Sequence, residues 1–440
     1  MKKIKNRAYF AMLIALGLVF GLCIFSIRLF SGGKDWVMLR ANQSVFNEGV
    51  LDTGTVTDRN GVVLAYAADN VYSYAEDETV RKSCFHAVGD YGGNIGSGAI
   101  TAFDFKLAGY DFINGVASVG GNGGKVKLSI DSSLNVVAYK ALNGRKGAVL
   151  VSNYKTGEIL CMVSTPSYDP NNPPDLTSAA YEGVYMNRAL GATYTPGSIF
   201  KLVTLSAAIE NIPDLYDRTF TCAGGVQVGG DTVHCTGVHG EQTIEQALAN
   251  SCNSAFSEIS QELGADTIYS YAEKLGFCKS FTVSGIETAA GSIDKAEPGT
   301  SNLSWMGIGQ YNDLIAPIAM LRFVSSIAND GVAKGPILLK SAYAGSTRLL
   351  KTETAQKLKD FMSYNVAYAY GAGNFPNLDI CAKTGTAEVG DGTSHAWFVG
   401  FLNDEDNPLA FTVIIENGGG GLANAGPVAN AVLQAAVAEK

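Results

Sequence analysis

The stretch TPGSIFKLVTLSAAIE (195–210) is the part of the sequence on which the assignment of the fold depends. Thr195 is a good N-cap residue, Pro196 suits a first helical turn, and an apolar run follows. The predicted helix carries Ser198 and Lys201 three residues apart, on one face. A serine becomes a nucleophile when a neighbouring base takes its proton, and a lysine of lowered pKa serves as such a base. Many serine–lysine pairs at this spacing simply lie on solvated helix surfaces, so the motif needs support from elsewhere in the chain.

A second polar motif, Ser251 to Asn253, lies between two predicted helices. The first helix begins with the capping box TIEQ (243–246), and a new apolar stripe follows the motif. At such a junction the Ser251 hydroxyl could relay protons and the Asn253 carboxamide could hold a substrate amide. Ordinary polar caps on two helices would leave the same pattern.

The third motif is KTGT (383–386), inside the predicted strand LDICAKTGTAEV (378–389). Glycine weakens a strand unless something must approach its backbone closely, so Gly385 indicates a close neighbour. An edge strand at this place could offer a backbone N–H to an oxyanion, while the hydroxyls of Thr384 and Thr386 hold a carboxylate.

The patterns around these motifs predict an α+β domain. Strand signals lie at its two ends and a helix-rich region lies between them, so both ends are expected to contribute to one sheet. An Asn-Gly turn predicts a separate hairpin nearer the N-terminus. The predicted segments are a hairpin at 54–66, a helix at 134–142, a hairpin at 147–165, helices across 197–330, strands at 378–389, 395–402 and 409–416, and a final helix at 427–438.

The N-terminal segment predicts a single-pass membrane anchor. Lys2, Lys3, Lys5 and Arg7 precede an apolar run over 8–27. About 20 apolar residues are enough to cross a bilayer as a helix. Basic residues before the span favour a cytoplasmic N-terminus and place the rest of the chain outside the cell membrane. A cleaved secretory signal is the alternative, and it too makes the bulk of the protein extracytoplasmic.

The composition excludes several classes of protein. The chain has 440 residues, of which 47% are hydrophobic and 17% charged, so a disordered chain and a polytopic membrane protein are both disfavoured. The formal net charge of −9 argues against nucleic acid as a partner, because phosphate binding needs a concentrated basic surface.

The eight cysteines leave their own chemistry open. Cys222 and Cys235 flank a Gly-rich hairpin pattern and could form a disulfide across it. His234 and His239 lie close by, so a metal site is conceivable, but the C-x-x-C spacing of a zinc knuckle is missing. A disulfide or free thiols are therefore favoured over zinc.

In this order, S-x-x-K, S-x-N and K-T-G match the serine–lysine signature of penicillin-binding enzymes. The chain resembles the class B penicillin-binding proteins, the membrane-anchored D,D-transpeptidases of bacterial cell-wall synthesis. The resemblance implies a penicillin-binding transpeptidase domain, similar in fold to the serine β-lactamases, with an antiparallel sheet flanked by helices and an all-helical subdomain. The segments that carry it beyond the three motifs are GTVTDRNGVVLA (54–65), GAVLVSNYKTGEILCMVSTPSYDPN (147–171), NRALGATYTPGSIFK (187–201) and MGIGQ (306–310).

The same resemblance implies a division of the chain into three parts. Residues 1–30 would be the cytoplasmic tail and transmembrane anchor, and 31–130 a small β-rich pedestal resembling a dimerisation region. Residues 131–440 would form the penicillin-binding transpeptidase domain.

Each motif residue acquires an implied role from the family. Ser198 would be the acylated nucleophile, Lys201 its general base and Ser251 a proton shuttle. Lys383 would lower the pKa of Lys201 through its charge. The substrate would be bound by Asn253, Thr384, Gly385 and Thr386, and the N–H groups of Ser198 and Thr386 would form the oxyanion hole.

The implied activity is a peptidoglycan D,D-transpeptidase that releases D-Ala and is acylated by β-lactams, with no metal or organic cofactor. The implied partners are D-Ala-D-Ala stem peptides and a membrane glycan polymerase of the SEDS type. The alternatives are a β-lactam sensor, a serine β-lactamase-like hydrolase and a D,D-carboxypeptidase. The sequence does not distinguish elongation, septation and sporulation roles.

Overall fold

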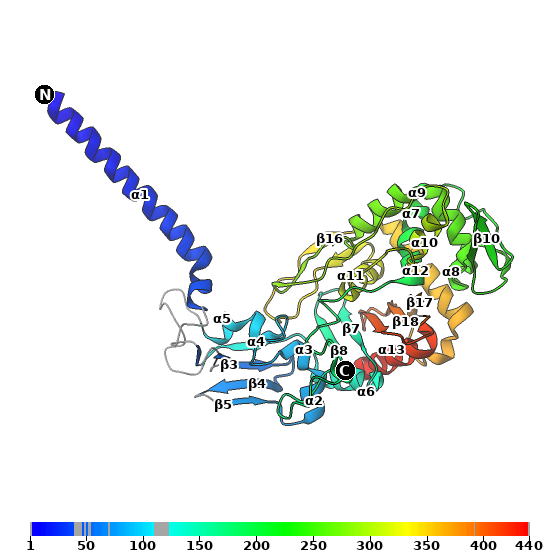
Figure 1. Cartoon of the computed structure of the whole chain (residues 1–440), viewed down its shortest axis with the longest axis horizontal. Helices are drawn as coiled ribbons and strands as arrows, with labels where there is room; N and C mark the ends of the chain where they lie inside the picture. Colours follow the sequence, from blue (N-terminus) through cyan, green and yellow to red (C-terminus); the bar gives the residue numbers. More distant parts are fainter. Residues whose placement is uncertain are drawn as a thin grey trace. The chain divides into compact units, whose positions relative to one another are not determined.

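The structure is a computed structural model in which the chain forms two compact units (Figure 1). The residues that it describes are 2–38, 46–47, 50–51, 54–68, 71–109, 123–390 and 392–438. The smaller unit comprises Met1–Val56, Ala65–Ser73 and Phe103–Val126, and the larger one Thr57–Leu64, Tyr74–Ala102 and Lys127–Lys440. Parts of the expected 31–130 pedestal lie outside the described residues.

The smaller unit contains the long helix α1 (Lys2–Val37). Within α1, Lys2–Gly33 is the one helical segment among the described residues that is long and apolar enough to cross a membrane. Short strands β1 (Phe46–Asn47) and β2 (Val50–Leu51) pair antiparallel. The helix agrees in length and composition with the expected anchor.

A four-stranded sheet has the order β5-β4-β3-β6. Its neighbours β3 and β4 meet around Asn60 and Gly61, so the hairpin predicted from the Asn-Gly turn is confirmed. The strands are β3 (Gly54–Thr57), β4 (Val63–Ala68), β5 (Val71–Tyr74) and β6 (Lys125–Lys127). Short helices nearby are α2 (Glu78–Ser83), α3 (Phe85–Val88), α4 (Ala99–Ala102) and α5 (Asp104–Leu107).

The larger unit is built on a five-stranded sheet in the order β17-β18-β19-β7-β8. Every pair of neighbours in it is antiparallel. Two strands precede the helical region and three follow it, which confirms that both ends of the domain contribute to one sheet. The strands are β7 (Gly147–Asn153), β8 (Ile159–Thr165), β17 (Ile380–Glu388), β18 (Ser394–Leu402) and β19 (Leu409–Ile415).

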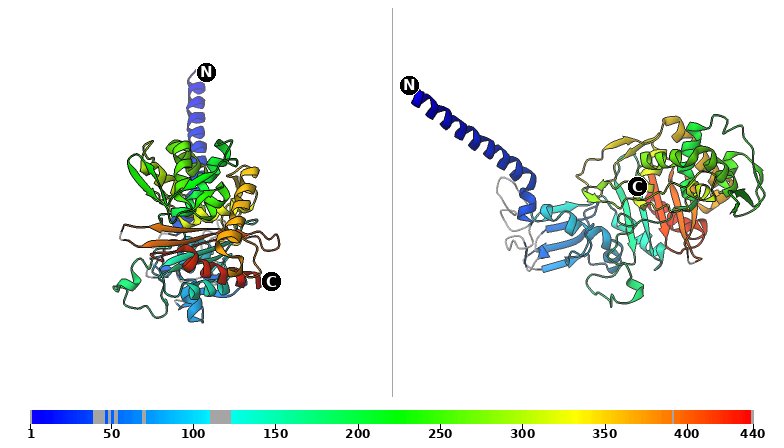
Figure 2. Two further views of the ribbon diagram at one scale, coloured as in Figure 1. Left: turned by 90° about the vertical axis from the view of Figure 1, so that its right-hand side faces the viewer. Right: turned by 45° about the horizontal axis from the view of Figure 1, so that its top comes forward.

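Helices cover both faces of this sheet (Figure 2). On one face lie α6 (Ser132–Leu142) and α13 (Gly421–Ala438), and on the other α11 (Pro317–Ala328) packs against β18, β19 and β7. Apolar side chains of α6, α13 and the sheet form the core, which removes them from water. Its members include Leu134, Ala138, Val149, Val151, Phe398, Phe411, Val413, Val428, Val432 and Leu433.

The final helix begins earlier than the sequence pattern predicts. We expect its start near Pro427, but α13 starts at Gly421 and Pro427 lies inside it. A Cβ atom at Gly421 would collide with the carbonyl oxygens of Gly385 and Trp397. Glycine therefore signals a close helix–sheet contact here, whereas in the sequence alone it looks like a loop.

The region between β8 and β17 is mainly helical, as predicted, and it also contains four two-stranded antiparallel sheets. Its two-stranded sheets pair β9 with β12, β10 with β11, β13 with β14 and β15 with β16. The helices are η1 (Ala179–Tyr181), η2 (Gly197–Phe200), α7 (Lys201–Asn211), α8 (Ile244–Ala249), α9 (Asn253–Leu275), α10 (Ser301–Ile308), α12 (Thr352–Asn365), η3 (Val366–Tyr370) and η4 (Ala372–Asn374). The strands are β9 (Phe220–Cys222), β10 (Gly225–Val228), β11 (Asp231–His234), β12 (Gly240–Gln242), β13 (Thr282–Val283), β14 (Ile286–Glu287), β15 (Val332–Lys334) and β16 (Ser346–Arg348).

A buried carboxylate ties the Asn-Gly turn to the start of α6. Asp58 is fully buried, and its Oδ1 accepts hydrogen bonds from the backbone N–H groups of Asn60 (2.8 Å) and Val62 (2.9 Å). Its Oδ2 accepts from the hydroxyl (2.7 Å) and the N–H (3.2 Å) of Ser132. Since buried donors are costly when unpaired, this carboxylate stabilises both segments at once.

We expect Asp58→Ala to lower the free energy of unfolding by about 2–3 kcal/mol, because it leaves buried donors without an acceptor. Chemical unfolding of the full chain in detergent measures this. Asp360→Ala, at an exposed position of α12, is the matched control. Equal effects of the two substitutions would contradict the role assigned to Asp58.

Candidate active site

Ser198 lies in the tight 3-10 turn η2, directly before α7. The single α-helix expected over Ser198 and Lys201 is therefore wrong in detail: the α-helix begins only at Lys201. With about three residues per turn, the 3-10 geometry still places the two side chains on one side. Gly197, at φ 55°, makes the turn possible, because a Cβ atom there would lie 2.9 Å from the Ala387 Cα.

Lys201 is fully buried and points at the second motif. Its Nζ lies 2.6 Å from the Ser251 carbonyl oxygen, 3.2 Å from Ser251 Oγ and 2.7 Å from Asn253 Oδ1. A neutral amine satisfies all three, since it donates to the two acceptor oxygens and accepts from the hydroxyl. The S-x-x-K and S-x-N motifs are thus in direct contact.

Burial lowers the pKa of the Lys201 ammonium to about 7, because an apolar environment disfavours the charged form. The Phe256 ring, whose centroid is 5.5 Å from Nζ, forms part of that environment. A lysine with this pKa is substantially neutral at physiological pH and can take a proton.

Lys383, on strand β17, contacts the same Ser251 hydroxyl. Its Nζ lies 3.2 Å from Ser251 Oγ and 2.8 Å from the Thr384 carbonyl oxygen. The pKa of Lys383 is lowered, first by burial and second by the charge of Lys201. We expected the charge of Lys383 to lower the pKa of Lys201. Instead, burial is the leading cause of the lowered pKa of Lys201, and it is the charge of Lys201 that lowers the pKa of Lys383.

Ser251 adopts an unusual backbone conformation at the point where both lysines meet. Its φ of 53° lies in the left-handed region, which non-glycine residues seldom adopt. The residue sits between α8, which has the predicted capping box, and α9. α9 is interrupted at Gly264, where the backbone φ of 74° is not helical.

The third motif lies on the edge strand of the sheet, as predicted. Thr384 is half-buried, and the Tyr370 hydroxyl lies 3.2 Å from its N and 3.3 Å from its Oγ1. Thr386 is exposed, and Gly385 between them is buried against the Ser198 turn. A Cβ atom at Gly385 would stand 3.0 Å from Ile199 Cγ2, which is the close neighbour that the glycine indicates.

These residues line one cavity of about 710 Å³. The predicted residues on its wall are Ser198, Ser251, Asn253, Thr384 and Thr386. Lys201 and Lys383 are buried and contact the wall through Ser251. The structure therefore brings all three motifs together around a single space.

Sequence reasoning missed several residues of the cavity. Trp305 and Tyr311 line it, and Tyr370 supports the edge strand from behind. Gln310 contacts the end of β17, because its Oε1 accepts a hydrogen bond from the Glu388 backbone N–H at 2.9 Å. Only Gln310 lies in a motif that the sequence singles out, and no local pattern marks the others.

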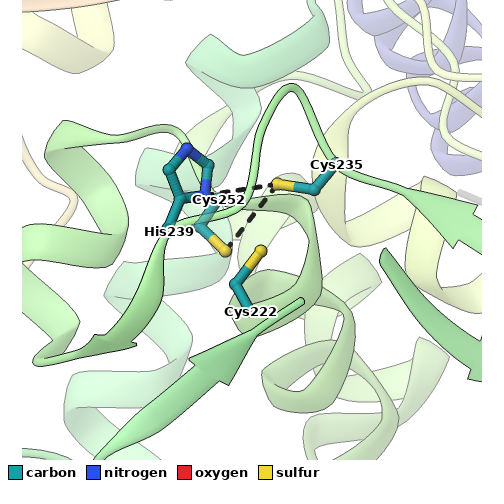
Figure 3. A group of neighbouring side chains, drawn as sticks. All are labelled: Cys222, Cys235, His239 and Cys252. Carbon is teal, nitrogen blue, oxygen red and sulfur yellow. Dashed lines mark hydrogen bonds between the residues drawn. The ribbon is translucent and has the colours of Figure 1, made fainter. Parts of the chain in front are cut away.

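Next to the cavity, Cys222, Cys235, His239 and Cys252 lie together (Figure 3). All four potential ligand atoms are within 4.8 Å of one another. The cysteines of the described chain are free thiols, so the disulfide considered between Cys222 and Cys235 is absent there. The His234 ring is not part of this group; its backbone carbonyl accepts from Asn253 Nδ2 at 2.9 Å.

Comparisons with known proteins agree on one family. Residues 147–434 match the penicillin binding protein transpeptidase domain. "Peptidoglycan D,D-transpeptidase PbpA" of Mycolicibacterium smegmatis is 30% identical over 393 residues, which cover 77% of this chain and 76% of that protein.

Two solved structures are similar over 88% of this chain. The ceftriaxone acyl-enzyme complex of penicillin-binding protein A from M. tuberculosis has a TM-score of 0.76, 26% identity and 98% of its own chain covered. The D,D-transpeptidase domain of a peptidoglycan glycosyltransferase from Eggerthella lenta has a TM-score of 0.74, 28% identity and 98% covered.

We expect Gly385→Ala to lower the free energy of unfolding by about 1–3 kcal/mol, because the added methyl group would press β17 away from the Ser198 turn. Thermal unfolding of the full chain measures the change. Gly390→Ala is the control, since a Cβ atom there has nothing within 4 Å. A Gly385→Ala protein as stable as the control would refute the close packing.

Proposed function

The chain belongs to the penicillin-binding protein transpeptidase family, and from this premise we propose how its site residues perform the family's reaction. The predicted resemblance to class B penicillin-binding proteins, the fold class and the activity of a peptidoglycan D,D-transpeptidase are all confirmed. The observation that carries the proposed roles is the meeting of two buried lysine amines at the Ser251 hydroxyl, on the wall of the cavity that holds Ser198.

In this proposal Ser198 is the nucleophile and Lys201 its general base. Lys201 is the first residue of α7, three residues after Ser198, and burial lowers its pKa to about 7. A neutral amine can therefore accept the Ser198 proton without an added base. Among the lysines of the described residues, Lys201 hydrogen-bonds to both Ser251 and Asn253 of the S-x-N motif, whereas Lys383 reaches Ser251.

In the first step, Ser251 carries the proton from Lys201 onward to the leaving amine. Its hydroxyl is within 3.2 Å of both Lys201 Nζ and Lys383 Nζ. A hydroxyl both donates and accepts, so it can pass a proton from Lys201 to the departing amine. Lys383 supplies positive potential at that hydroxyl when it is charged.

The substrate is held by Asn253 and the edge strand. Asn253 lines the cavity and would bond the peptide backbone of the substrate. Thr384 and Thr386 would bind the terminal carboxylate, and Gly385 lets the strand approach the Ser198 turn. The N–H groups of Ser198 and Thr386 would form the oxyanion hole.

The reaction is acyl transfer in two steps. Ser198 Oγ attacks the carbonyl of the D-Ala-D-Ala peptide bond, the C–N bond breaks, and D-Ala leaves with the transferred proton. An amine of a neighbouring stem peptide then attacks the ester, forms the cross-link and returns the proton to Ser198. A β-lactam acylates the same serine. The amine released when its ring opens remains part of the acyl group, so the whole opened molecule stays attached to Ser198 through the ester.

The setting of the enzyme is also part of the proposal. Residues 1–30 would anchor the chain with its N-terminus in the cytoplasm, 31–130 would form the pedestal, and 131–440 the extracytoplasmic transpeptidase domain. The long apolar helix Lys2–Gly33 supports the anchor. A SEDS-type glycan polymerase is the proposed membrane partner, which would supply the glycan strands that this chain cross-links.

We predict that Ser198→Ala abolishes both labelling by a fluorescent penicillin and release of D-Ala from an acyl-D-Ala-D-Ala peptide. The fold is expected to be unchanged, because Ser198 is partly exposed at the cavity wall. Ser270→Ala, at an exposed serine of α9, should behave as the unaltered protein does.

Labelling that survives in Ser198→Ala would overturn the assignment of the nucleophile. The lifetime of the penicillin adduct separates the alternatives: a long-lived adduct is expected of a transpeptidase, and rapid turnover would indicate a β-lactamase-like hydrolase. Labelling without any D-Ala release would indicate a sensor. Release of D-Ala to water alone, with an acceptor amine present, would indicate a carboxypeptidase.

A further inference from the structure

Three cysteines and one histidine converge beside the active-site cavity from four separate segments (Figure 3). Cys222 ends β9, Cys235 follows β11, His239 precedes β12 and Cys252 precedes α9. Figure 3 shows the sulfur atoms and the His239 ring turned toward a common centre. Nothing in the transpeptidase reaction requires such a group, so it needs its own explanation.

The spacing of these atoms fits a tetrahedral metal site. Zinc bonds of about 2.3 Å to sulfur and 2.0–2.1 Å to nitrogen, at tetrahedral angles, place two sulfur atoms about 3.8 Å apart and sulfur and nitrogen about 3.5 Å apart. Here Cys235 Sγ lies 3.8 Å from Cys252 Sγ and 3.5 Å from His239 Nδ1. The remaining pairs are within 4.8 Å, so small side-chain rotations complete the tetrahedron.

The surroundings of the sulfur atoms suit thiolates. The backbone N–H of Asn253 points at Cys235 Sγ at 3.2 Å, and the Ser254 hydroxyl donates to Cys222 Sγ at 3.4 Å. Such outer hydrogen bonds orient metal ligands and offset their charge. Cys222 and Cys252 are buried while Cys235 and His239 are half-buried, which leaves a path for a metal ion to enter.

We propose that Cys222, Cys235, His239 and Cys252 bind one Zn²⁺ ion as a structural site. Three thiolates and one imidazole form a closed set of four ligands, the usual arrangement of structural zinc. Soft sulfur ligands select zinc over magnesium or calcium. Binding releases the three thiol protons, and His239 coordinates as the neutral ring through Nδ1.

The site has a direct connection to catalysis, and this connection rests on the proposed function. Cys252 stands between Ser251 and Asn253, whose oxygen atoms accept hydrogen bonds from Lys201 Nζ. A bond from zinc to Cys252 Sγ therefore fixes the turn in which Ser251 holds its φ of 53°. Cys235 lines the cavity itself, so the ion also anchors one wall of the substrate site.

A disulfide is the competing use of these thiols, because an extracytoplasmic setting favours oxidation. One disulfide would join two of the three sulfur atoms and leave a thiol and an imidazole facing it. The observed convergence of all four groups favours the metal. The two uses give opposite results in a count of free thiols and bound zinc.

The first test measures the zinc content of the full-length chain, purified in detergent and dialysed, by inductively coupled plasma mass spectrometry. We expect one zinc per chain, and at least a tenfold lower occupancy in Cys222→Ser and Cys235→Ser. Cys278→Ser, at a half-buried cysteine outside the cluster, is the matched control and should keep its zinc.

Replacement of the metal by Co²⁺ in the unaltered protein tests the ligands without a variant that could misfold. Intense thiolate-to-cobalt bands in the near ultraviolet and visible bands typical of a tetrahedral ion are expected. A chain that binds neither ion, a disulfide found by peptide mapping between cysteines of the cluster, or zinc retained in both serine variants would overturn the proposal.

The second test concerns the link to the Ser251 turn. Removal of zinc with a chelator should slow acylation of the full chain by benzylpenicillin about tenfold, and Zn²⁺ but not Mg²⁺ should restore the rate. Circular dichroism before and after shows whether the fold persists. An acylation rate unaffected by zinc removal would overturn the positioning role. A zinc-loaded chain that is never acylated would instead refute the proposed function and leave the metal site standing.

Discussion

Two buried lysine amines meet at one serine hydroxyl, and the rest of the site depends on this contact. Lys201 and Lys383 are both fully buried, and each lies 3.2 Å from Ser251 Oγ. Burial disfavours an ammonium ion at both lysines, and at Lys383 the charge of Lys201 disfavours it further. In the proposed function, Lys201 is therefore substantially neutral near pH 7 and can serve as the base for Ser198, although a lysine in water is charged at that pH.

The fold holds this contact from three directions. The Ser198 turn brings Lys201, the junction of α8 and α9 brings Ser251, and the edge strand β17 brings Lys383. Glycines allow the segments to approach: Gly197 lies against β17, and Gly385 against the Ser198 turn. The core that the sheet forms with α6 and α13 includes residues of β17, and β17 is held in register with β18 so that Lys383 is paired with Val399.

Strand patterns at the two ends of the domain predicted the sheet, and the three short motifs predicted the motif residues of the cavity wall and the edge position of KTGT, because each pattern has a local signature. The 3-10 turn at Ser198 and the early start of α13 could not be predicted from the sequence. In both places a glycine, Gly197 or Gly421, is required by close contact with a distant part of the chain. The cysteine cluster was predicted only in part: Cys222, Cys235 and His239 were considered for a metal site, but a disulfide or free thiols were favoured and Cys252 was not connected to them. Its ligands come from four segments without C-x-x-C spacing, and Cys252 is hidden inside the S-x-N motif.

The central claim, that burial keeps Lys201 neutral as the base, is tested most directly by titrating that amine. Lysine labelled with ¹³C at Cε, followed by NMR in the full chain and assigned by its loss in Lys201→Met, reports the charge of Nζ. The account predicts a midpoint at about pH 7, with the ammonium form below it and the neutral, proton-accepting amine above it. A midpoint near the ordinary lysine value of 10.5 would contradict it, because Lys201 would then remain charged at neutral pH.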